Sequence, residues 1–306
     1  MMGRMSIEPE LRALSERALI CPAPTLATIA VSGADRLTWL GGMVTGDVKG
    51  LLPGSACRTL IVGTTGRLLA DVWVLVAAER VLVGVPREHV EGVRSHLEAH
   101  LVMEDAELTL ENGPVWWFAY GPEAAAVAAV GERLGATVGR GSLVGLEVAA
   151  MAIPPGAARN LAEDLTAPTG ALLATPEGWQ RVRVERLLPE AGLDFELGGY
   201  PQEARLERFA VSFQKGCYVG QEAVYMLEKR GHAPKRLARV RVRGRADIST
   251  GEEVLAEDGS VAGTVATVSP DGADAWVLAL LRFKHTTTGT ALRIGGASAE
   301  VSEPAD

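Results

Sequence analysis

The sequence lacks the excess of basic side chains that a general nucleic-acid-binding protein needs. Its 306 residues include 30 Lys and Arg against 38 Asp and Glu, which gives a formal net charge of −8. Aromatic side chains, which could stack on unpaired bases, make up only 5% of the chain. Because affinity for a phosphate backbone comes largely from clustered Lys and Arg, the composition argues against direct nucleic-acid binding.

The sequence also lacks a long apolar run. The longest candidate, residues 68–78, is interrupted by Asp71, whereas a membrane-spanning helix needs roughly 18 or more apolar residues. The N-terminal segment carries charges from Arg4 to Arg12 and has no cationic stretch followed by an apolar core, as a secretory signal would. We therefore expect a cytoplasmic protein without a membrane partner.

Cysteine is scarce, with only Cys21, Cys57 and Cys217, and no C-x-x-C pair occurs. This pattern fits a reducing compartment, and one chain cannot build a four-cysteine zinc or iron–sulfur site. Any role in cluster chemistry must be transient, shared with another chain or dependent on other ligands. His96 and His100 have the i, i+4 spacing of a metal-binding pair, but no third ligand has matching spacing. We predict no resident metal.

Residues up to about 134 mix strand and helix patterns without a regular βαβ alternation, which predicts an α+β fold. Apolar runs separated by turn residues predict strands at 26–31, 56–62, 67–76, 80–85, 106–110 and 115–119. Amphipathic patterns predict helices at 86–101, with Val90, Val93 and Leu97 on the buried face, and at 123–134.

The second half of the sequence predicts a helix followed by a small β-barrel. Thr175-Pro176-Glu177 is typical of a helix start, with a capping hydroxyl and an early proline. A strand is expected at 209–213 and a helix at 221–230. Further strands are expected at 237–242, 252–256, 260–268, 275–283 and 291–294, with a hairpin at Asp258-Gly259. We place the domain boundary near Pro234, between domains 1–234 and 235–306.

The most informative segment is Lys215-Gly216-Cys217-Tyr218-Val219-Gly220-Gln221-Glu222. A cysteine two residues from a lysine and shortly before a helix is expected to favour the thiolate. Cys217 is therefore the candidate reactive thiol, and the alternative is a small buried hydrophobic residue. Gly216 and Gly220 indicate a backbone that approaches another group closely.

This octapeptide, K-G-C-Y-V-G-Q-E, resembles the signature of the YgfZ-type folate-binding proteins, relatives of the glycine cleavage T-protein (aminomethyltransferase). Similar matches occur at residues 31–47, at Gly66 to Asp71 and at Pro201 to Ala204, so the resemblance covers effectively the whole chain. It implies a pseudo-cloverleaf, T-protein-like folate-binding fold of intertwined α+β subdomains, closed by a C-terminal β-barrel domain.

The resemblance also implies a function. Proteins of this kind bind tetrahydrofolate and are linked to assembly or repair of iron–sulfur clusters in selected enzymes, including one that methylthiolates tRNA. It implies folate and iron–sulfur client proteins or assembly factors as partners, an accessory protein more than a classical enzyme, and Cys217 with Lys215 as the reacting residues.

Folate requires a carboxylate for the adjacent N–H donors of its pterin and basic side chains for its glutamyl tail. The R-x-E of Arg183 and Glu185 matches the helix that supplies the pterin carboxylate in the T-protein, so Glu185 is the candidate pterin ligand; the alternative is an exposed helix acid. Arg230 and Lys235 are candidates for the tail, with solvated surface as the alternative. The matched motifs add Asp71, Tyr218 and Gln221.

Departures from the T-protein pattern leave two other functions open. This chain has Ala70-Asp71 where the T-protein has paired aspartates, and Cys217 and Gln221 replace an acid and a base of its motif. A neutral Gln cannot replace a cation that pairs with a carboxylate. Because of these departures, folate-dependent aminomethyl transfer is only the second hypothesis, after the accessory role. A redox-sensing or structural module with a vestigial folate pocket is the third.

Overall fold

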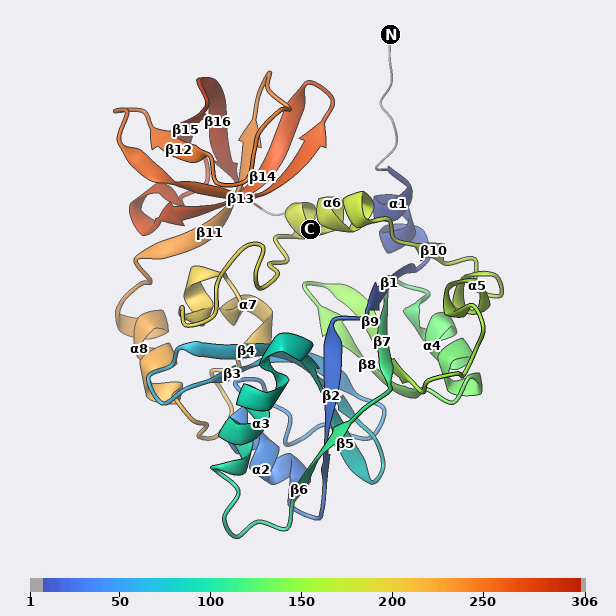
Figure 1. The fold of residues 1–306 in the computed structure, drawn as a ribbon. Coiled ribbons are helices and arrows are strands. Elements are labelled where there is room, and N and C mark those ends of the chain that lie inside the picture. Colours follow the sequence, from blue (N-terminus) through green and yellow to red (C-terminus); the bar gives the residue numbers. More distant parts are fainter. Residues whose placement is uncertain (1–7, 304–306) are drawn as a thin grey trace. The chain divides into compact units, whose positions relative to one another are not determined.

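The computed structural model describes residues 8–303, which fall into two compact units (Figure 1). The first, called the sheet unit, contains residues 9–174 and 208–221. The second, called the barrel unit, contains residues 175–207 and 222–303 together with Glu8. The boundary expected near Pro234 lies inside the barrel unit and stays a prediction.

The sheet unit is built on two five-stranded sheets (Figure 1). One sheet has the order β3-β4-β5-β2-β6, from β2 (Leu26–Ser32), β3 (Ala56–Val62), β4 (Leu68–Val76), β5 (Arg80–Pro86) and β6 (Glu107–Glu111). The other has the order β10-β1-β7-β9-β8, from β1 (Leu19–Ala23), β7 (Val115–Tyr120), β8 (Thr137–Leu143), β9 (Leu146–Ile153) and β10 (Leu172–Leu173). All pairs are antiparallel except β1 with β10.

Within the part of the chain that the structure describes, seven helical segments accompany these sheets, of which the sequence predicts those at 87–98 and 124–133. They are α1 (Glu8–Glu16), α2 (Arg36–Met43), η1 (Arg87–His89), α3 (Val90–Glu98), α4 (Ala124–Arg133), α5 (Leu161–Thr166) and α7 (Glu207–Ala210). Helix α3 buries Val90, Val93 and Leu97 in the core of the first sheet, as predicted. The two sheets meet where Trp116 Nε1 donates to Thr28 Oγ1 at 2.9 Å, against Gly84, whose missing side chain leaves room for the indole.

The barrel unit contains a closed six-stranded barrel with the order β11-β14-β13-β12-β15-β16. Its strands are β11 (Lys235–Val242), β12 (Glu253–Ala256), β13 (Val261–Asp271), β14 (Asp274–Arg282), β15 (Ala291–Ile294) and β16 (Ala297–Ser302). The predicted hairpin joins β12 to β13, and Gly259 has the positive φ of +81° that this turn requires. Because the barrel is closed, each of its strands is hydrogen-bonded on both sides and no strand edge is left unpaired.

Helix α6 (Pro176–Arg186) packs on the outside of this barrel. It begins as predicted, since Thr175 Oγ1 accepts a hydrogen bond from Gly178 N at 3.0 Å. Val184 and Leu187 contact Leu237 and Leu278 in one apolar cluster. The remaining helices of the unit are η2 (Pro201–Glu203), α8 (Gln221–Arg230), which has the predicted bounds, and η3 (Phe283–His285).

The strand expected at 209–213 is wrong. Residues 207–210 form the short helix α7, and the chain then runs as a loop. The hydrogen bonds explain why: Ala210 O accepts from Thr45 Oγ1 at 2.6 Å, and Ser212 N donates to Thr45 O at 2.9 Å. These backbone groups are therefore paired with the single residue Thr45 and not with a neighbouring strand. The α+β class and the C-terminal barrel are confirmed. No helix within residues 8–303 is long and apolar enough to span a membrane.

Candidate functional site

In the sheet unit, residues 215–220 of the octapeptide form a loop that is fixed to the C-terminal end of α2. Lys215 Nζ donates to Gly41 O at 2.6 Å and to Val44 O and Gly46 O at 2.7 Å. The last carbonyls of a helix have no intrahelical partner and carry the negative end of its dipole. A lysine ammonium is therefore a fitting partner for the end of α2.

The charge of Lys215 interacts with those of Asp47 and Cys57. Burial lowers the pKa of Lys215 to about 8, against the opposing effects of Asp47 and Cys57. Burial raises the pKa of Cys57 to about 12, although Lys215 opposes this shift. Lys215 thus contacts three carbonyls and interacts with the charges of Asp47 and Cys57, and its expected effect on the Cys217 thiol stays a prediction.

A second contact fixes the loop beyond the cysteine. Val219 N donates to Gly42 O at 3.0 Å, again at the end of α2. Gly220 has a φ of +78°, and a Cβ built on it would lie 2.2 Å from Gly63 O. The close approach expected from the glycines is confirmed at Gly220 and wrong at Gly216, which has no atom within 4 Å of its Cβ position. The loop is held on both sides of Cys217.

Cys217 itself is exposed, so the alternative of a buried packing residue is wrong. It lies four residues before Gln221, where α8 begins, and is therefore outside the first helical turn, where a helix dipole acts most strongly. Cys21 is buried in β1, and burial together with Glu10 raises the pKa of its thiol. Of the three cysteines, Cys217 is the one that a reagent or partner can reach directly.

Tyr218 follows Cys217 in the same loop, and Gln221 begins α8. The Tyr218 side chain is buried, its ring centroid lies 5.2 Å from Lys215 Nζ, and burial raises its pKa to about 12. Its hydroxyl is buried without a hydrogen-bond partner among the described residues. Gln221 is half-buried, and its backbone N donates to Tyr218 O at 3.2 Å.

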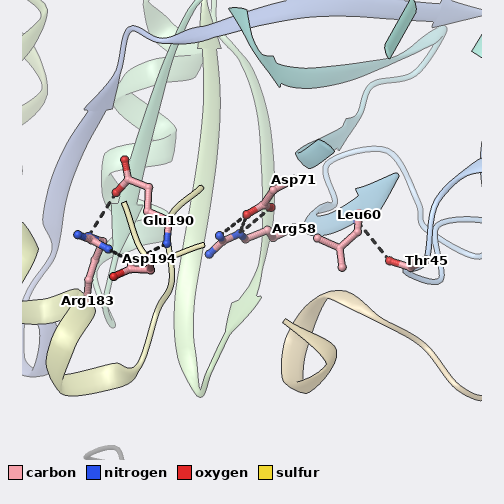
Figure 2. A network of polar contacts seen from close by, with 7 residues as sticks. All are labelled: Thr45, Arg58, Leu60, Asp71, Arg183, Glu190 and Asp194. Atoms are coloured by element: carbon pink, nitrogen blue, oxygen red, sulfur yellow. Dashed lines mark hydrogen bonds and ion pairs between the residues drawn. The ribbon is translucent and has the colours of Figure 1, made fainter. Parts of the chain in front are cut away.

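Asp71 lies in β4 and already has a partner in the sheet unit. Arg58 Nε on the neighbouring strand β3 donates to both carboxylate oxygens, at 2.9 and 3.2 Å, and Arg58 Nη2 contacts Oδ2 (Figure 2). The Arg58 guanidinium also lies 5.2 Å from the centroid of the Phe209 ring. Figure 2 also shows Leu60 N of β3 donating to Thr45 Oγ1 at 3.2 Å.

Glu185 is buried on α6 in the barrel unit, so the alternative of an exposed helix acid is wrong. Its Oε1 lies 2.8 Å from Arg181 Nη2, and its Oε2 accepts from Arg239 Nη2 on β11. The Arg239 guanidinium stacks on Trp276 at 3.5 Å from the ring centroid. The carboxylate therefore links the helix to the barrel through Arg239, while its contact with Arg181 lies within α6.

A second buried ion pair, which the sequence did not reveal, lies at the end of the same helix (Figure 2). Arg183 Nη1 donates to Asp194 Oδ2 at 2.5 Å, and Arg183 Nε lies 3.3 Å from Glu190. Asp194 also accepts from Glu190 N at 2.9 Å and from Thr267 Oγ1 of β13 at 2.6 Å. The only hint in the sequence is the matched Arg183.

The remaining candidates lie on the surface. Arg230 ends α8 and Lys235 begins β11, and both are exposed. The His96 and His100 rings lie 4.7 Å apart, and burial lowers the pKa of His96. Within residues 8–303, no group of three or more His, Cys, Asp and Glu side chains is arranged to hold a metal ion.

Comparisons with known proteins now add to this geometry. Residues 235–306 match the family described as the CAF17 C-terminal beta-barrel domain. A chloroplastic protein of Arabidopsis thaliana, named as a "putative transferase", is 25% identical over 293 residues, which cover 87% of this chain and 66% of the relative. The chain thus spans slightly less than two thirds of that relative.

A solved structure has the same fold. The glycine cleavage system aminomethyltransferase T from Bartonella henselae has a TM-score of 0.80 and 18% identity, covering 99% of this chain and 90% of that one. The predicted T-protein-like fold with a C-terminal β-barrel is confirmed. The chain is similar in fold to aminomethyltransferase T and, over residues 235–306, similar in sequence to the CAF17 barrel domains.

Proposed function

We propose that this protein binds a tetrahydrofolate and uses Cys217 in the assembly or repair of iron–sulfur clusters, with an indirect effect on tRNA modification. The observation that carries the proposal is an exposed thiol on a loop whose backbone is fixed on both sides by the end of α2. The octapeptide, the aminomethyltransferase T fold and the match to the CAF17 barrel domain support it. The expected cytoplasmic location is part of the same proposal.

The residues of each unit fit a ligand with the donors of a pterin. Glu185 and Asp71 already accept bonds from arginines, but both oxygens of Glu185 and Oδ1 of Asp71 each have a second lone pair with which to accept an N–H. Gln202 Oε1, Glu207 Oε2 and the Tyr218 hydroxyl are buried without a hydrogen-bond partner. In the barrel unit, Glu185 is the proposed pterin ligand, and Arg230 and Lys235 are proposed for the glutamyl tail. In the sheet unit, Asp71, Tyr218 and Gln221 are the proposed folate-binding residues.

When bound, tetrahydrofolate would supply a reduced pterin able to carry a one-carbon unit. The chemistry of this chain is that of a soft thiolate, which is the ligand type that iron in iron–sulfur clusters prefers. A single cysteine supplies one of the four ligands that a cluster needs. We therefore propose that Cys217 contacts a cluster only while the other ligands come from a client protein or assembly factor.

The test combines binding and cellular activity. We expect titration of the purified protein with tetrahydrofolate to give saturable binding without release of formaldehyde or methylene-folate. Cys217→Ser should leave this affinity nearly unchanged and should abolish support of iron–sulfur enzymes in a strain that lacks the protein. A serine variant that restores those enzymes fully would contradict the proposal. Cys21→Ser is the matched control, because that thiol is buried in β1.

Aminomethyl transfer is the second candidate function. The fold of aminomethyltransferase T and the name of the Arabidopsis relative favour it. The substitutions at Cys217 and Gln221 weigh against it, because they remove an acid and a base of the transferase motif. Turnover of tetrahydrofolate with a lipoylated aminomethyl carrier would establish transfer and would displace the accessory role.

A further inference from the structure

Lys215 uses all of its hydrogen-bonding capacity on the backbone at the end of α2. A lysine ammonium has three N–H donors and no acceptor, and Lys215 Nζ meets three carbonyl oxygens at 2.6–2.7 Å. The acceptors belong to Gly41, Val44 and Gly46, where α2 ends and the next loop begins. Donors and acceptors therefore match one to one, and no donor remains for the thiol two residues away.

The contacts of Lys215 and Val219 anchor the backbone on both sides of Cys217. Lys215 lies two residues before the cysteine, and Val219, whose N donates to Gly42 O at 3.0 Å, lies two residues after it. Both anchors reach the same end of α2, while the Cys217 side chain is exposed. This arrangement fixes the backbone and leaves the sulfur accessible, as transfer to or from a partner requires.

We propose that Lys215 is a positioning residue, which clamps residues 215–219 onto the end of α2 and thereby presents Cys217, and that the clamp holds only while Lys215 carries its proton. What Cys217 then does rests on the proposed function, whereas the clamp rests on the contacts described above. This role is separate from the one expected from the sequence, in which the charge of Lys215 favours the thiolate of Cys217 and which stays a prediction.

The charge dependence follows from counting donors. A neutral amine has two N–H donors, so on losing its proton Lys215 leaves one of the three carbonyls without a partner. Burial brings the pKa of Lys215 to about 8, and the groups that face it are Asp47, Cys57 and Tyr218. Burial raises the pKa values of Cys57 and Tyr218 to about 12, so neither titrates near pH 8. Among Lys215, Cys57 and Tyr218, Lys215 is therefore the group that would change charge there.

Hydrogen exchange at the Val219 amide tests the clamp directly. After correction for the intrinsic exchange rate, we expect protection of this amide in the wild-type protein to fall by about tenfold between pH 7 and 9, as the charged fraction of a group with a pKa of about 8 falls. Lys215→Met should give low protection without this pH dependence. Lys215→Arg, which stays charged throughout, should also lack it. Lys49→Met, at an exposed lysine just after α2, should behave as wild type.

Alkylation separates the clamp from an effect on the thiol pKa. We expect the pH midpoint of Cys217 alkylation in Lys215→Met to equal that of the wild type. A midpoint raised by about one unit, with Val219 protection unchanged, would overturn the clamp. In cells, Lys215→Met should reduce iron–sulfur enzyme activity as Cys217→Ser does. If Cys217→Ser has no effect there, the proposed function fails, but the exchange result still decides the clamp.

Discussion

The two regions that carry the predicted site residues use their polar atoms in opposite ways. Around Glu185, one buried carboxylate pairs with two buried arginines, Arg181 on α6 and Arg239 on the barrel strand β11. Around Cys217, a lysine and backbone groups satisfy each other at the end of α2, and the thiol is left exposed. The Glu185 carboxylate, a candidate ligand, is itself part of the ion pairs that hold α6 on the barrel. At Cys217 it is the neighbouring residues that hold the loop, and the thiol remains accessible.

This difference determines whether a substitution at each residue also changes the stability of the fold. A buried carboxylate bound to two arginines cannot be neutralised without leaving charge behind in a region of low dielectric constant. An exposed thiol on an anchored backbone can be changed at little cost to the fold. We therefore expect substitutions at Glu185 to affect both stability and binding, and substitutions at Cys217 to affect chemistry alone.

The largest expected effect is at Glu185. Glu185→Gln leaves Arg181 and Arg239 buried without their carboxylate, so the free energy of unfolding should fall by about 3–5 kcal/mol. Denaturant titration measures this, and the exposed acid of the same helix gives the control Glu177→Gln, with a change below about 0.5 kcal/mol. The sequence alone predicts something different, a loss of folate affinity on the order of tenfold to a hundredfold without unfolding.

The free energy of unfolding and the tetrahydrofolate affinity should be measured on the same Glu185→Gln protein. A variant that keeps its stability but loses tetrahydrofolate affinity would show that the carboxylate is spare in the free protein, and that the ion-pair network contributes little. A variant that is destabilised but retains normal affinity at low temperature would remove Glu185 from the folate site and leave it as a link between α6 and the barrel.

The next effect concerns the three thiols. Because the thiolate is the reactive form, a Cys57 thiol with a pKa of about 12 has only about one thiolate in 10⁵ at neutral pH. Cys217 should therefore be alkylated at least about a hundredfold faster than Cys57 or Cys21 in the folded protein. Mass spectrometry of peptides after timed alkylation measures the three rates. Cys217→Ser should remove the fast phase, and equal rates at all three thiols would contradict the contrast between the regions.

Sequence reasoning worked where local chemistry decides the structure. The Thr175 cap, the apolar face of α3, the hairpin at Gly259 and the bounds of α8 all follow from patterns within a few residues. It failed where a distant partner decides. The strand expected at 209–213 is displaced by hydrogen bonds to Thr45, more than 160 residues earlier in the chain.

The site shows the same limit. The octapeptide identifies Lys215 and Cys217 as a pair, because they are neighbours in sequence. The actual partners of Lys215 are carbonyls near residue 44, and backbone acceptors carry no signal in the amino-acid sequence. The Arg181 and Arg239 partners of Glu185 illustrate a related point: Arg181 is visible at i, i−4 on the helix, but Arg239 depends on which barrel face α6 covers.

The smallest expected effect concerns the two glycines that flank Cys217. Gly220→Ala forces a φ of +78° on a residue with a Cβ and places that atom 2.2 Å from Gly63 O, so the loop must shift. We expect a loss of about 2–3 kcal/mol in unfolding free energy, combining left-handed backbone strain and overpacking. Gly216→Ala meets no atom within 4 Å and has no positive φ, so its change should stay within about 0.5 kcal/mol. Paired denaturant titrations of the two variants measure the difference. If both variants are equally stable, the loop after Cys217 is not fixed against the β3–β4 turn, and the proposed presentation of the thiol would depend on the anchors at Lys215 and Val219 alone.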